Sequence, residues 1–533
     1  MKRSAVLTII VGGLVLAQAW TRTFDGGYSG YDAASAVAVT PSDDIVVGGS
    51  IGKPGHVDCP AVSKWASSGA LVWFKTYEPY PGFDGYVTDI GVTKNGCVFA
   101  ACACRDSSNV WTTIVLKLAP DGSMQKHVHF SDPAHLYDYP TDLELDRSQN
   151  CLVAMASDVS SLNGVTRVMK LDSAGNVQWT SVYDHWGRHN DPAALAVDSA
   201  GNSYVVGEAI TSWSNAATLA KFSPQGDTCW TTTYDPEGEN TYFRDVVVHG
   251  DSLYVVGDIS HGTPRLLVAA YDAVTGDTFW SREMAIGAGV GISAIDTLGI
   301  FGCGYAADSL TAEDFKVFRC GSNGSPKWVA RYDGPGHDYD VPYDIGVSPQ
   351  GLVYVVGASG GGATSTDCAT LSYEPTGSLR WVARFTGDGS PSYDQGSRLC
   401  LDSRGNVIVA GFATMASTGK DILLIKYPPT GPGVTEDERE VASRERTITA
   451  RPTVASTATE FVLTGLERPD VIRIVDPSGR VVKRITPTRA GSTRFTARWD
   501  LSDQTGRRVP NGLYLVIVMW AGHVGTTHVV VQH

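Results

Sequence analysis

The 533-residue sequence lacks several patterns that would assign it to a class at once. After the first 19 residues no stretch approaches the roughly 18 apolar residues in a row that a membrane-spanning helix needs. There is no HExxH, no P-loop and no Rossmann glycine pattern, so metalloprotease, NTPase and dinucleotide-binding classes lack support. The ten cysteines include no CxxC spacing and no adjacent pair, which leaves no zinc or thiol redox motif.

Basic residues are in deficit, because the formal net charge is −14. The acidic excess lies in the first 430 residues, since residues 447–533 hold eleven Lys and Arg against six Asp and Glu. Nucleic-acid phosphates need a basic footprint, so we expect no nucleic-acid partner. Cationic ligands and divalent metals are compatible with this charge. The cysteines stand singly within expected strands, which favours buried small residues; a few cross-strand disulfides are the open alternative.

The N-terminus has the pattern of a secretory signal peptide. Lys2 and Arg3 precede an apolar run from Ala5 to Leu16, and Ala17-Gln18-Ala19 supplies a small-x-small cleavage pattern. We therefore expect a signal peptide over residues 1–19 and a mature chain that starts at Trp20. The mature protein is expected to be secreted or held at the cell surface, with no transmembrane segment.

A repeat built around tryptophan fills residues 20–430. Its anchors are Trp20, Trp73, Trp179, Trp230, Trp280, Trp328 and Trp381. Lys126 stands between Trp73 and Trp179, where the spacing calls for a further Trp. The spacing of 48 to 53 residues is that of one four-stranded propeller blade. Second strands such as Tyr204-Val-Val-Gly207 recur eight times, which predicts eight blades. The last unit ends at Tyr427 without a Trp strand, so we expect the strand at Trp20 to close it.

Two positions of the unit have a packing interpretation. The Trp is expected to fill the widening gap between neighbouring blades. A small residue is expected in the second strand, where converging blades leave little room. Its predicted places are Gly48, Gly207, Gly257, Gly302, Gly357 and Gly411, with Ala101 and Met155 in the second and third units.

These units resemble the SBBP-type β-propeller repeats of bacteria. The family pattern Asp-x-x-Gly-Asn-x-Tyr-Val-x-Gly is matched by Asp198 to Gly207. The resemblance covers residues 20 to about 430 and implies a bacterial propeller. It implies no particular chemistry, because the family is recognised by residues that build the blades. The family is usually described as seven-bladed, whereas eight units are counted in this sequence.

A linker and a second domain follow the repeats. Residues 431–446 are rich in Pro and Gly and then in charged residues, which predicts a solvated linker. Residues 447–533 contain six to seven short strand patterns separated by turns, which predicts a small β-sandwich.

Motifs in this second domain carry a further resemblance. Val471 to Gly479, Trp499-Asp500, Gly506 and Pro510-Asn-Gly-Leu-Tyr514 resemble the immunoglobulin-like (Ig-like) domain of flagellar hook-capping proteins. They also resemble the C-terminal sorting domains of the type IX secretion pathway. The resemblance implies an Ig-like fold that serves sorting across the outer membrane or surface attachment.

One candidate site is a ring of carboxylates. An aromatic residue followed by Asp enters successive units, with Asn190 in the fourth unit, so the carboxylates would surround one mouth of the channel. The ring consists of Asp32, Asp84, Asp138, Asp340 and Asp394. Oxygen ligands in this arrangement are suited to Ca²⁺. The alternative is that each Asp accepts backbone N–H bonds within a turn. No other cofactor is expected.

A second candidate site breaks the repeat. The long connection between the third and fourth units contains His185, Trp186, Arg188 and His189, which are the candidate ligand contacts because binding sites depart from a repeat. Asp272 to Trp280 resembles one docking repeat of eight-bladed quinoprotein dehydrogenases. Gly357-Ala-Ser-Gly-Gly361 fits the nucleophile-elbow spacing, but that motif needs a strand-to-helix turn.

The sequence therefore predicts an exported all-β protein, an eight-bladed β-propeller followed by a small Ig-like β-sandwich. The predicted function is non-catalytic binding or scaffolding at the cell surface by a monomer. The expected partner is an unidentified protein or glycan. The alternative is a propeller enzyme, either a quinoprotein-like dehydrogenase or a carbohydrate-active enzyme, since a fold by itself fixes no function.

Overall fold

The described structure consists of strands, turns and loops. It is a computed structural model that describes the chain except residues 1–19, 29, 54–55, 133–135, 161–162, 185–188, 212–213, 237, 261, 296–297, 308–311, 363–364, 433–446, 452–453, 465–470, 477–479, 490–493, 521–522 and 533. The predicted signal peptide and most of the predicted linker lie outside the described residues. Nothing in the described part is a helix with the length and apolarity needed to span a bilayer. Two compact units divide between Pro432 and Gly433.

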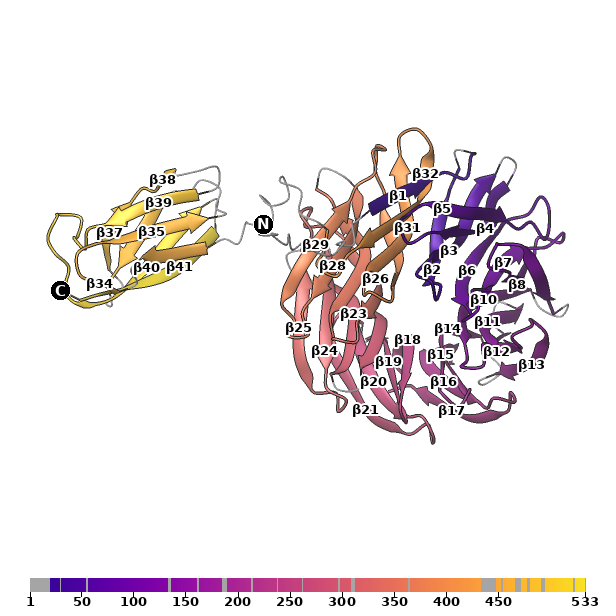
Figure 1. Cartoon of the computed structure of the whole chain (residues 1–533). Coiled ribbons are helices and arrows are strands. Elements are labelled where there is room, and N and C mark those ends of the chain that lie inside the picture. Colours follow the sequence, from indigo (N-terminus) through magenta and orange to yellow (C-terminus); the bar gives the residue numbers. More distant parts are fainter. Residues whose placement is uncertain are drawn as a thin grey trace, which may run out of the picture. The chain divides into compact units, whose positions relative to one another are not determined.

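Eight antiparallel four-stranded sheets follow one another in the first unit (Figure 1). Sheet 1 contains β2 (Ala33–Val39), β3 (Ile45–Lys53), β4 (His56–Trp65) and β5 (Leu71–Thr76), and sheet 2 contains β6 (Gly85–Val92), β7 (Val98–Arg105), β8 (Trp111–Leu118) and β9 (Met124–Phe130). Sheet 3 contains β10 (Tyr137–Leu145), β11 (Cys151–Ser160), β12 (Asn163–Leu171) and β13 (Val177–Tyr183), and sheet 4 contains β14 (Asn190–Val197), β15 (Ser203–Ile210), β16 (Asn215–Phe222) and β17 (Thr228–Tyr234).

The remaining four sheets have the same strand order. Sheet 5 contains β18 (Asn240–His249), β19 (Ser252–Ser260), β20 (Pro264–Asp272) and β21 (Thr278–Ile286), and sheet 6 contains β22 (Ala288–Ile295), β23 (Gly299–Ala307), β24 (Glu313–Cys320) and β25 (Pro326–Tyr332). Sheet 7 contains β26 (Asp340–Val347), β27 (Val353–Gly360), β28 (Thr366–Tyr373) and β29 (Leu379–Phe385), and sheet 8 contains β30 (Gln395–Leu401), β31 (Val407–Met415), β32 (Gly419–Tyr427) and β1 (Trp20–Phe24).

The sheets form a closed ring. The first strand of each sheet contacts the first strand of the next, and β30 of sheet 8 contacts β2 of sheet 1. Strand β1 pairs antiparallel with β32, from Trp20 opposite Lys426 to Phe24 opposite Ile422. The N-terminal strand thus completes the last sheet, as the sequence predicts. This arrangement is a β-propeller, in which ring closure leaves no long open sheet edge at the seam.

Tryptophans of the fourth strands join neighbouring sheets. A Cβ added to Gly69 would lie 2.8 Å from the Trp20 ring, and one added to Gly431 would lie 2.7 Å from the Trp381 ring. Equivalent contacts join Trp73 to Gly122, Trp179 to Gly226, Trp230 to Gly276, Trp280 to Gly324 and Trp328 to Gly377. These glycines have positive φ, such as +82° at Gly69, which favours glycine in the turn. The Trp therefore packs between blades, which confirms the packing interpretation.

Lys126 takes the place of Trp in sheet 2. A Cβ at Gly175 in the turn of sheet 3 would lie 3.4 Å from Cδ of Lys126 and of Lys117. The Lys126 ammonium hydrogen-bonds to the side chain of Asn176. The alkyl chain thus covers the turn that an indole covers elsewhere, which explains how the repeat accommodates this exception.

The small residue of the second strand lies opposite a β-bulge. Every first strand has a register shift, and the glycine faces the residue before it. A Cβ on the glycine would collide with a carbonyl oxygen of the first strand. The glycines are Gly49, Gly207, Gly257, Gly304, Gly357 and Gly411, with Cys102 and Met155 in sheets 2 and 3. The predictions of Gly48, Gly302 and Ala101 were wrong, because the bulge rather than blade convergence sets the position.

The cysteines are free thiols. Eight are buried, Cys400 is half-buried and Cys229 is exposed. Cys102 and Cys104 lie two residues apart on β7 and are both buried. For these eight, the interpretation as buried small residues is confirmed.

The second unit contains two sheets that share one hydrophobic core. One sheet is β33 (Thr447–Arg451), β35 (Thr459–Thr464), β39 (Arg494–Trp499) and β38 (Thr488–Arg489). The other is β34 (Val454–Ala455), β41 (His523–Val531), β40 (Gly512–Trp520), β36 (Val471–Val475) and β37 (Val481–Ile485). Phe461 and Trp499 from the first sheet and Ile474 and Val516 from the second are buried together.

Residues of the predicted motifs stabilise this core. The Trp499 indole N–H donates to the carbonyl of Ser502 at 2.8 Å. The Tyr514 hydroxyl donates to the carbonyl of Pro510 at 2.9 Å, and its ring centroid lies 5.3 Å from that of Trp499. The motif residues thus build the fold of this unit.

Ring closure by β1 predicts a specific loss of stability in Trp20→Ala. The variant loses a half-buried indole and its hydrogen bond to Ser67, so we expect the free energy of unfolding to fall by about 3 kcal/mol. Thr21→Ala, at an exposed position of the same strand, is the matched control and should fall by less than about 1 kcal/mol. Chemical denaturation of both variants measures the difference. Equal losses would contradict a closing role for Trp20.

Candidate functional site

The predicted carboxylate ring is bound into the backbone. Asp32 Oδ2 accepts the N–H of Gly26 at 2.6 Å, and its Oδ1 accepts the N–H of Gly52 at 2.9 Å. Asp340 likewise accepts N–H bonds from the glycines at 334 and 360, and Asp394 accepts them from residues 387 and 414. Each carboxylate thus ties the incoming loop to the end of a second strand.

Asp138 and Asp84 complete the predicted ring. Asp138 accepts the N–H of Asp132 at 2.8 Å and the hydroxyl of Ser157 at 2.5 Å. Asp84 lies four residues before the bulged Thr88, whereas the other four stand three residues before their bulges, so Gly85 occupies the equivalent place in sheet 2.

Two of these carboxyls belong to acidic groups suited to a cation. Asp25 and Asp421 lie beside Asp32, and Asp314 and Asp333 lie beside Asp340, with ligand atoms of each group within 4.8 Å of one another. Burial raises the pKa of Asp32 and of Asp340 above the usual value, although the N–H donors act in the opposite direction.

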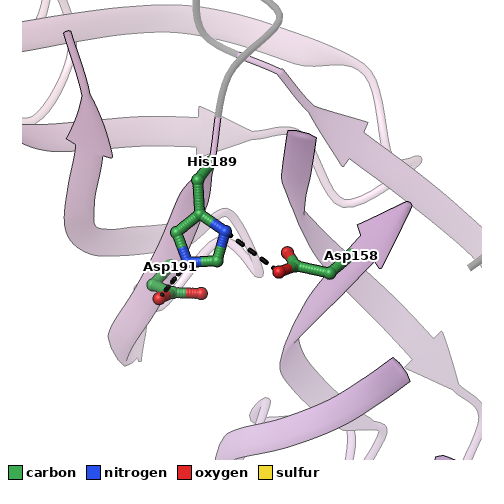
Figure 2. A group of neighbouring side chains, drawn as sticks. All are labelled: Asp158, His189 and Asp191. Atoms are coloured by element: carbon green, nitrogen blue, oxygen red, sulfur yellow. Dashed lines mark hydrogen bonds and ion pairs between the residues drawn. The ribbon is translucent and has the colours of Figure 1, made fainter. Parts of the chain in front are cut away.

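His189 lies between two carboxylates (Figure 2). Its Nδ1 is 3.0 Å from Oδ2 of Asp158, and its Nε2 is 2.7 Å from Oδ2 of Asp191. The Asp158 side chain is only 3% exposed, and burial raises the pKa of its carboxyl. The imidazole stands where most other units have an aromatic residue, one position before Asn190. The candidate ligand contact His189 thus lies beside two carboxylates, and its role in binding stays a prediction; His185, Trp186 and Arg188 lie outside the described residues.

A second set of carboxylates joins the first strands of neighbouring sheets. Each stands directly after the bulged residue and accepts the backbone N–H of a residue in the next sheet. The bonds are Asp89 to Leu143 at 3.1 Å, Asp142 to Leu195 at 2.6 Å, Asp245 to Ile292 at 2.8 Å and Asp344 to Leu399 at 2.8 Å. These residues are not among the candidates predicted from the sequence, although an Asp at one place in four units was a visible signal.

Burial shifts the titration of this second set. It raises the pKa of Asp245 to about 7, against the opposing effect of the Ile292 and Val246 N–H donors. Burial also raises the pKa of Asp89 well above its usual range, and the neighbouring Asp142 carboxyl adds to the shift. Arg398 of β30 is the nearby cation that favours ionisation of Asp89 and of Asp344. These carboxyls therefore act as inter-sheet connectors whose charge depends on pH.

A cavity of about 360 Å³ lies between sheets 5 and 6, where first strands begin. Its polar wall contains Arg244, Asp258 and Glu313, and Tyr305 supplies an aromatic ring. The Arg244 Nε is 3.3 Å from Oδ1 of Asp258, and burial raises the pKa of that carboxyl. No motif marks this site in the sequence; its one local trace is the run Gly287-Ala-Gly289, where sheet 5 has Thr241-Tyr-Phe243.

A larger hollow of about 720 Å³ lies among the turns after the first strands of sheets 3, 4 and 5. Several of its polar side chains hold those turns together. Asp198 accepts N–H bonds from Ala200 and Asn202, and the Lys221 ammonium donates to the carbonyl of Ala273 at 2.8 Å. The quinoprotein-like stretch also has a local role, since the Asp272 carboxylate accepts the N–H of Val274 within its turn.

Comparisons with known proteins show similarity of fold alone. No protein-family model and no curated protein sequence matches this chain, so the SBBP and sorting-domain resemblances stay predictions. Among solved structures, Chaetomium thermophilum Sqt1 bound to the N-terminus of ribosomal protein L10 is 12% identical, with a TM-score of 0.49 over 76% of this chain and 98% of that one. Quinohemoprotein alcohol dehydrogenase from Comamonas testosteroni is 11% identical, with a TM-score of 0.49 over 79% and 77%.

PorZ, a surface component of the type IX secretion system of Porphyromonas gingivalis, is 11% identical. Its TM-score is 0.30 over 94% of this chain and 81% of that chain. Likeness at this level carries no argument about activity, ligand or partner.

The backbone bonds of the carboxylate ring predict a weak response to Ca²⁺. Ligand lone pairs of Asp32, Asp138, Asp340 and Asp394 already accept hydrogen bonds, so added Ca²⁺ should leave the melting temperature nearly unchanged. A specific site at 100 times its Kd would instead add about 2.7 kcal/mol to the free energy of unfolding. Differential scanning calorimetry with and without Ca²⁺ makes the measurement. A saturable stabilisation that disappears in Asp340→Asn or Asp32→Asn would show that these groups bind the ion.

The raised pKa of Asp245 predicts a dependence of stability on pH. The folded state holds the proton up to about pH 7, whereas the unfolded chain releases it near its usual value of 3.8. This contribution to the free energy of unfolding is therefore complete at low pH and is lost as the pH rises toward and through 7. We expect Asp245→Asn to reduce the fall of the melting temperature between pH 5 and pH 8.

Asp227→Asn, in an exposed turn, is the matched control and should keep the wild-type pH dependence. Thermal unfolding followed by circular dichroism at both pH values measures the slope. A slope that Asp245→Asn leaves unchanged would contradict the assignment.

Proposed function

We propose that this protein is an exported, non-catalytic binding protein that acts at the bacterial cell surface. In this proposal the eight sheets are eight blades of one propeller closed by β1, and the propeller presents the ligand site. The second unit is an Ig-like sandwich that serves sorting or attachment. The proposal rests on the signal-peptide pattern and on one structural observation, the cavity between sheets 5 and 6.

The cavity carries the proposal because polar groups converge where the repeat is broken. Repeated residues build the scaffold, and a site for one ligand needs a departure from them. Arg244, Asp258 and Glu313 meet Tyr305 at such a departure. Small-molecule sites have this composition, in which a few placed polar groups accompany aromatic or apolar wall.

The second set of carboxylates has structural partners, which supports a scaffold rather than a catalytic role for these groups. Asp89, Asp142, Asp245 and Asp344 each accept an N–H from the next sheet. A carboxylate used in this way holds the ring together and has reduced capacity to act on a substrate.

The cavity also favours a second candidate function, a carbohydrate-active enzyme. It contains two carboxyl groups, and burial raises the pKa of one of them, Asp258. Glycoside hydrolysis uses two carboxyls, one of which acts as the acid. Recovery of an unchanged ligand after prolonged incubation supports binding alone, and release of a product identifies the enzyme.

Export and attachment are tested by truncation in the native host. A chain that ends at about residue 435 keeps all eight sheets, because β1 closes the last sheet and the second unit contributes no strand to it. We expect the truncated protein to fold and to accumulate in the periplasm, whereas the full chain reaches the surface or medium. Protease accessibility on intact cells and fractionation measure the location.

A second variant, Trp499→Ala, removes the buried Trp of the second unit but keeps the chain length. It should also reduce surface delivery. Full delivery of the truncated propeller would show that the second unit is a spacer or a partner-binding module.

A further inference from the structure

Small residues at the start of β22 line the cavity between sheets 5 and 6. Counted from the bulge, Thr241-Tyr-Phe243 of β18 corresponds to Gly287-Ala-Gly289 at the start of β22. The aromatic pair of sheet 5 is thus replaced by Ala288 and Gly289. The resulting volume of about 360 Å³ exceeds the lower limit of about 300 Å³ for small-molecule sites.

Arg244 is held at the cavity wall by two contacts. It is the bulged residue of β18, and a bulge redirects a side chain from the regular strand alternation. Its Nε lies 3.3 Å from Oδ1 of Asp258, and its guanidinium carbon lies 4.6 Å from the centroid of the Tyr242 ring. Packing of the planar guanidinium against the aromatic ring restricts its motion and orients its donors.

The cavity wall carries charges of both signs, which disfavours a ligand with a single net charge. An anionic ligand would meet the carboxylates of Asp258 and Glu313, and a cationic ligand would meet Arg244. Hydroxyl groups suit both kinds of group, since each donates to a carboxylate and accepts from a guanidinium. The Tyr305 ring adds a surface for the apolar side of a ligand.

We propose that this cavity binds one or two rings of a neutral saccharide. Arg244 donates to the sugar hydroxyls, Asp258 and Glu313 accept from them, and Tyr305 contacts the C–H face of a ring. This inference rests on the proposed binding function and adds the class of ligand to it. A neutral ligand with several hydroxyl groups can contact all four side chains, and it places no charge next to a side chain of the same sign.

The test uses the mature chain, residues 20–533. The neutral probes are glucose, galactose, mannose, N-acetylglucosamine and their β-linked disaccharides, and the charged comparisons are glucuronic acid and glucosamine. Saturation-transfer-difference NMR detects binding, and isothermal titration calorimetry gives the Kd. We expect saturable binding of a neutral sugar and weaker binding of both charged sugars.

Two variants locate the binding. Glu313→Gln should raise the Kd about tenfold through loss of a charge-assisted hydrogen bond, and Ala288→Tyr should abolish binding because it restores the aromatic side chain of sheet 5. Ala33→Tyr makes the same change at the equivalent place in sheet 1 and should bind as the wild type does. The melting temperature of each variant checks that it is folded.

Three results overturn the inference: no neutral sugar binds, a charged sugar binds more tightly, or both cavity variants bind as the wild type does. A protein that reaches the surface but binds no sugar overturns the saccharide alone. A protein that binds sugar in the cavity but stays in the cytoplasm overturns the proposed function alone.

Discussion

The ring depends on one repeated contact, a fourth-strand side chain packed on a glycine turn of the next sheet. Seven tryptophans and Lys126 make this contact, from Trp20 on Gly69 to Trp381 on Gly431. The turn needs positive φ, and the indole needs a surface without a Cβ, so glycine meets both requirements. Because the first and last contacts both involve sheet 8, the ring holds only if the N-terminal strand is in place.

The same residue type stabilises the ring at two further positions. Aspartates three residues before the bulge tie loops to second strands, as Asp340 does through two N–H bonds. Aspartates directly after the bulge, such as Asp245, bridge to the next sheet, and burial raises the pKa of Asp245 to about 7. Burial opposes their charge while the N–H donors favour it, so the ring carries carboxyls whose stabilising effect varies with pH.

Departures from the repeat mark the places where this scaffold can acquire chemistry. His189 replaces an aromatic residue and lies between Asp158 and Asp191. Three small residues at the start of β22 leave the cavity that Arg244 and Glu313 line. Both lie where first strands begin, so the side chains at these departures stand on strands that the ring itself holds in position.

The sequence by itself determined the sheets, because strand periodicity, turn residues and the Trp spacing are local properties that recur in every unit. It also determined which strand is missing from the last unit and which end of the chain supplies it. The register of the bulge was decided only in the tertiary structure: Gly49 and Gly304 stand opposite carbonyl oxygens, one or two residues away from the places that the repeat suggested. Asp84 is displaced from its expected equivalence for the same reason.

The cavity could not be predicted from one sequence, since its walls come from six strands of two sheets and part of its volume from small side chains at the start of β22. A missing side chain leaves no motif, and the distance between Arg244 and Asp258 exists only after two strands have paired. Local sequence thus determined the repeating scaffold, and only the tertiary structure decided the site, because a cavity is a property of neighbours that the chain brings together on folding.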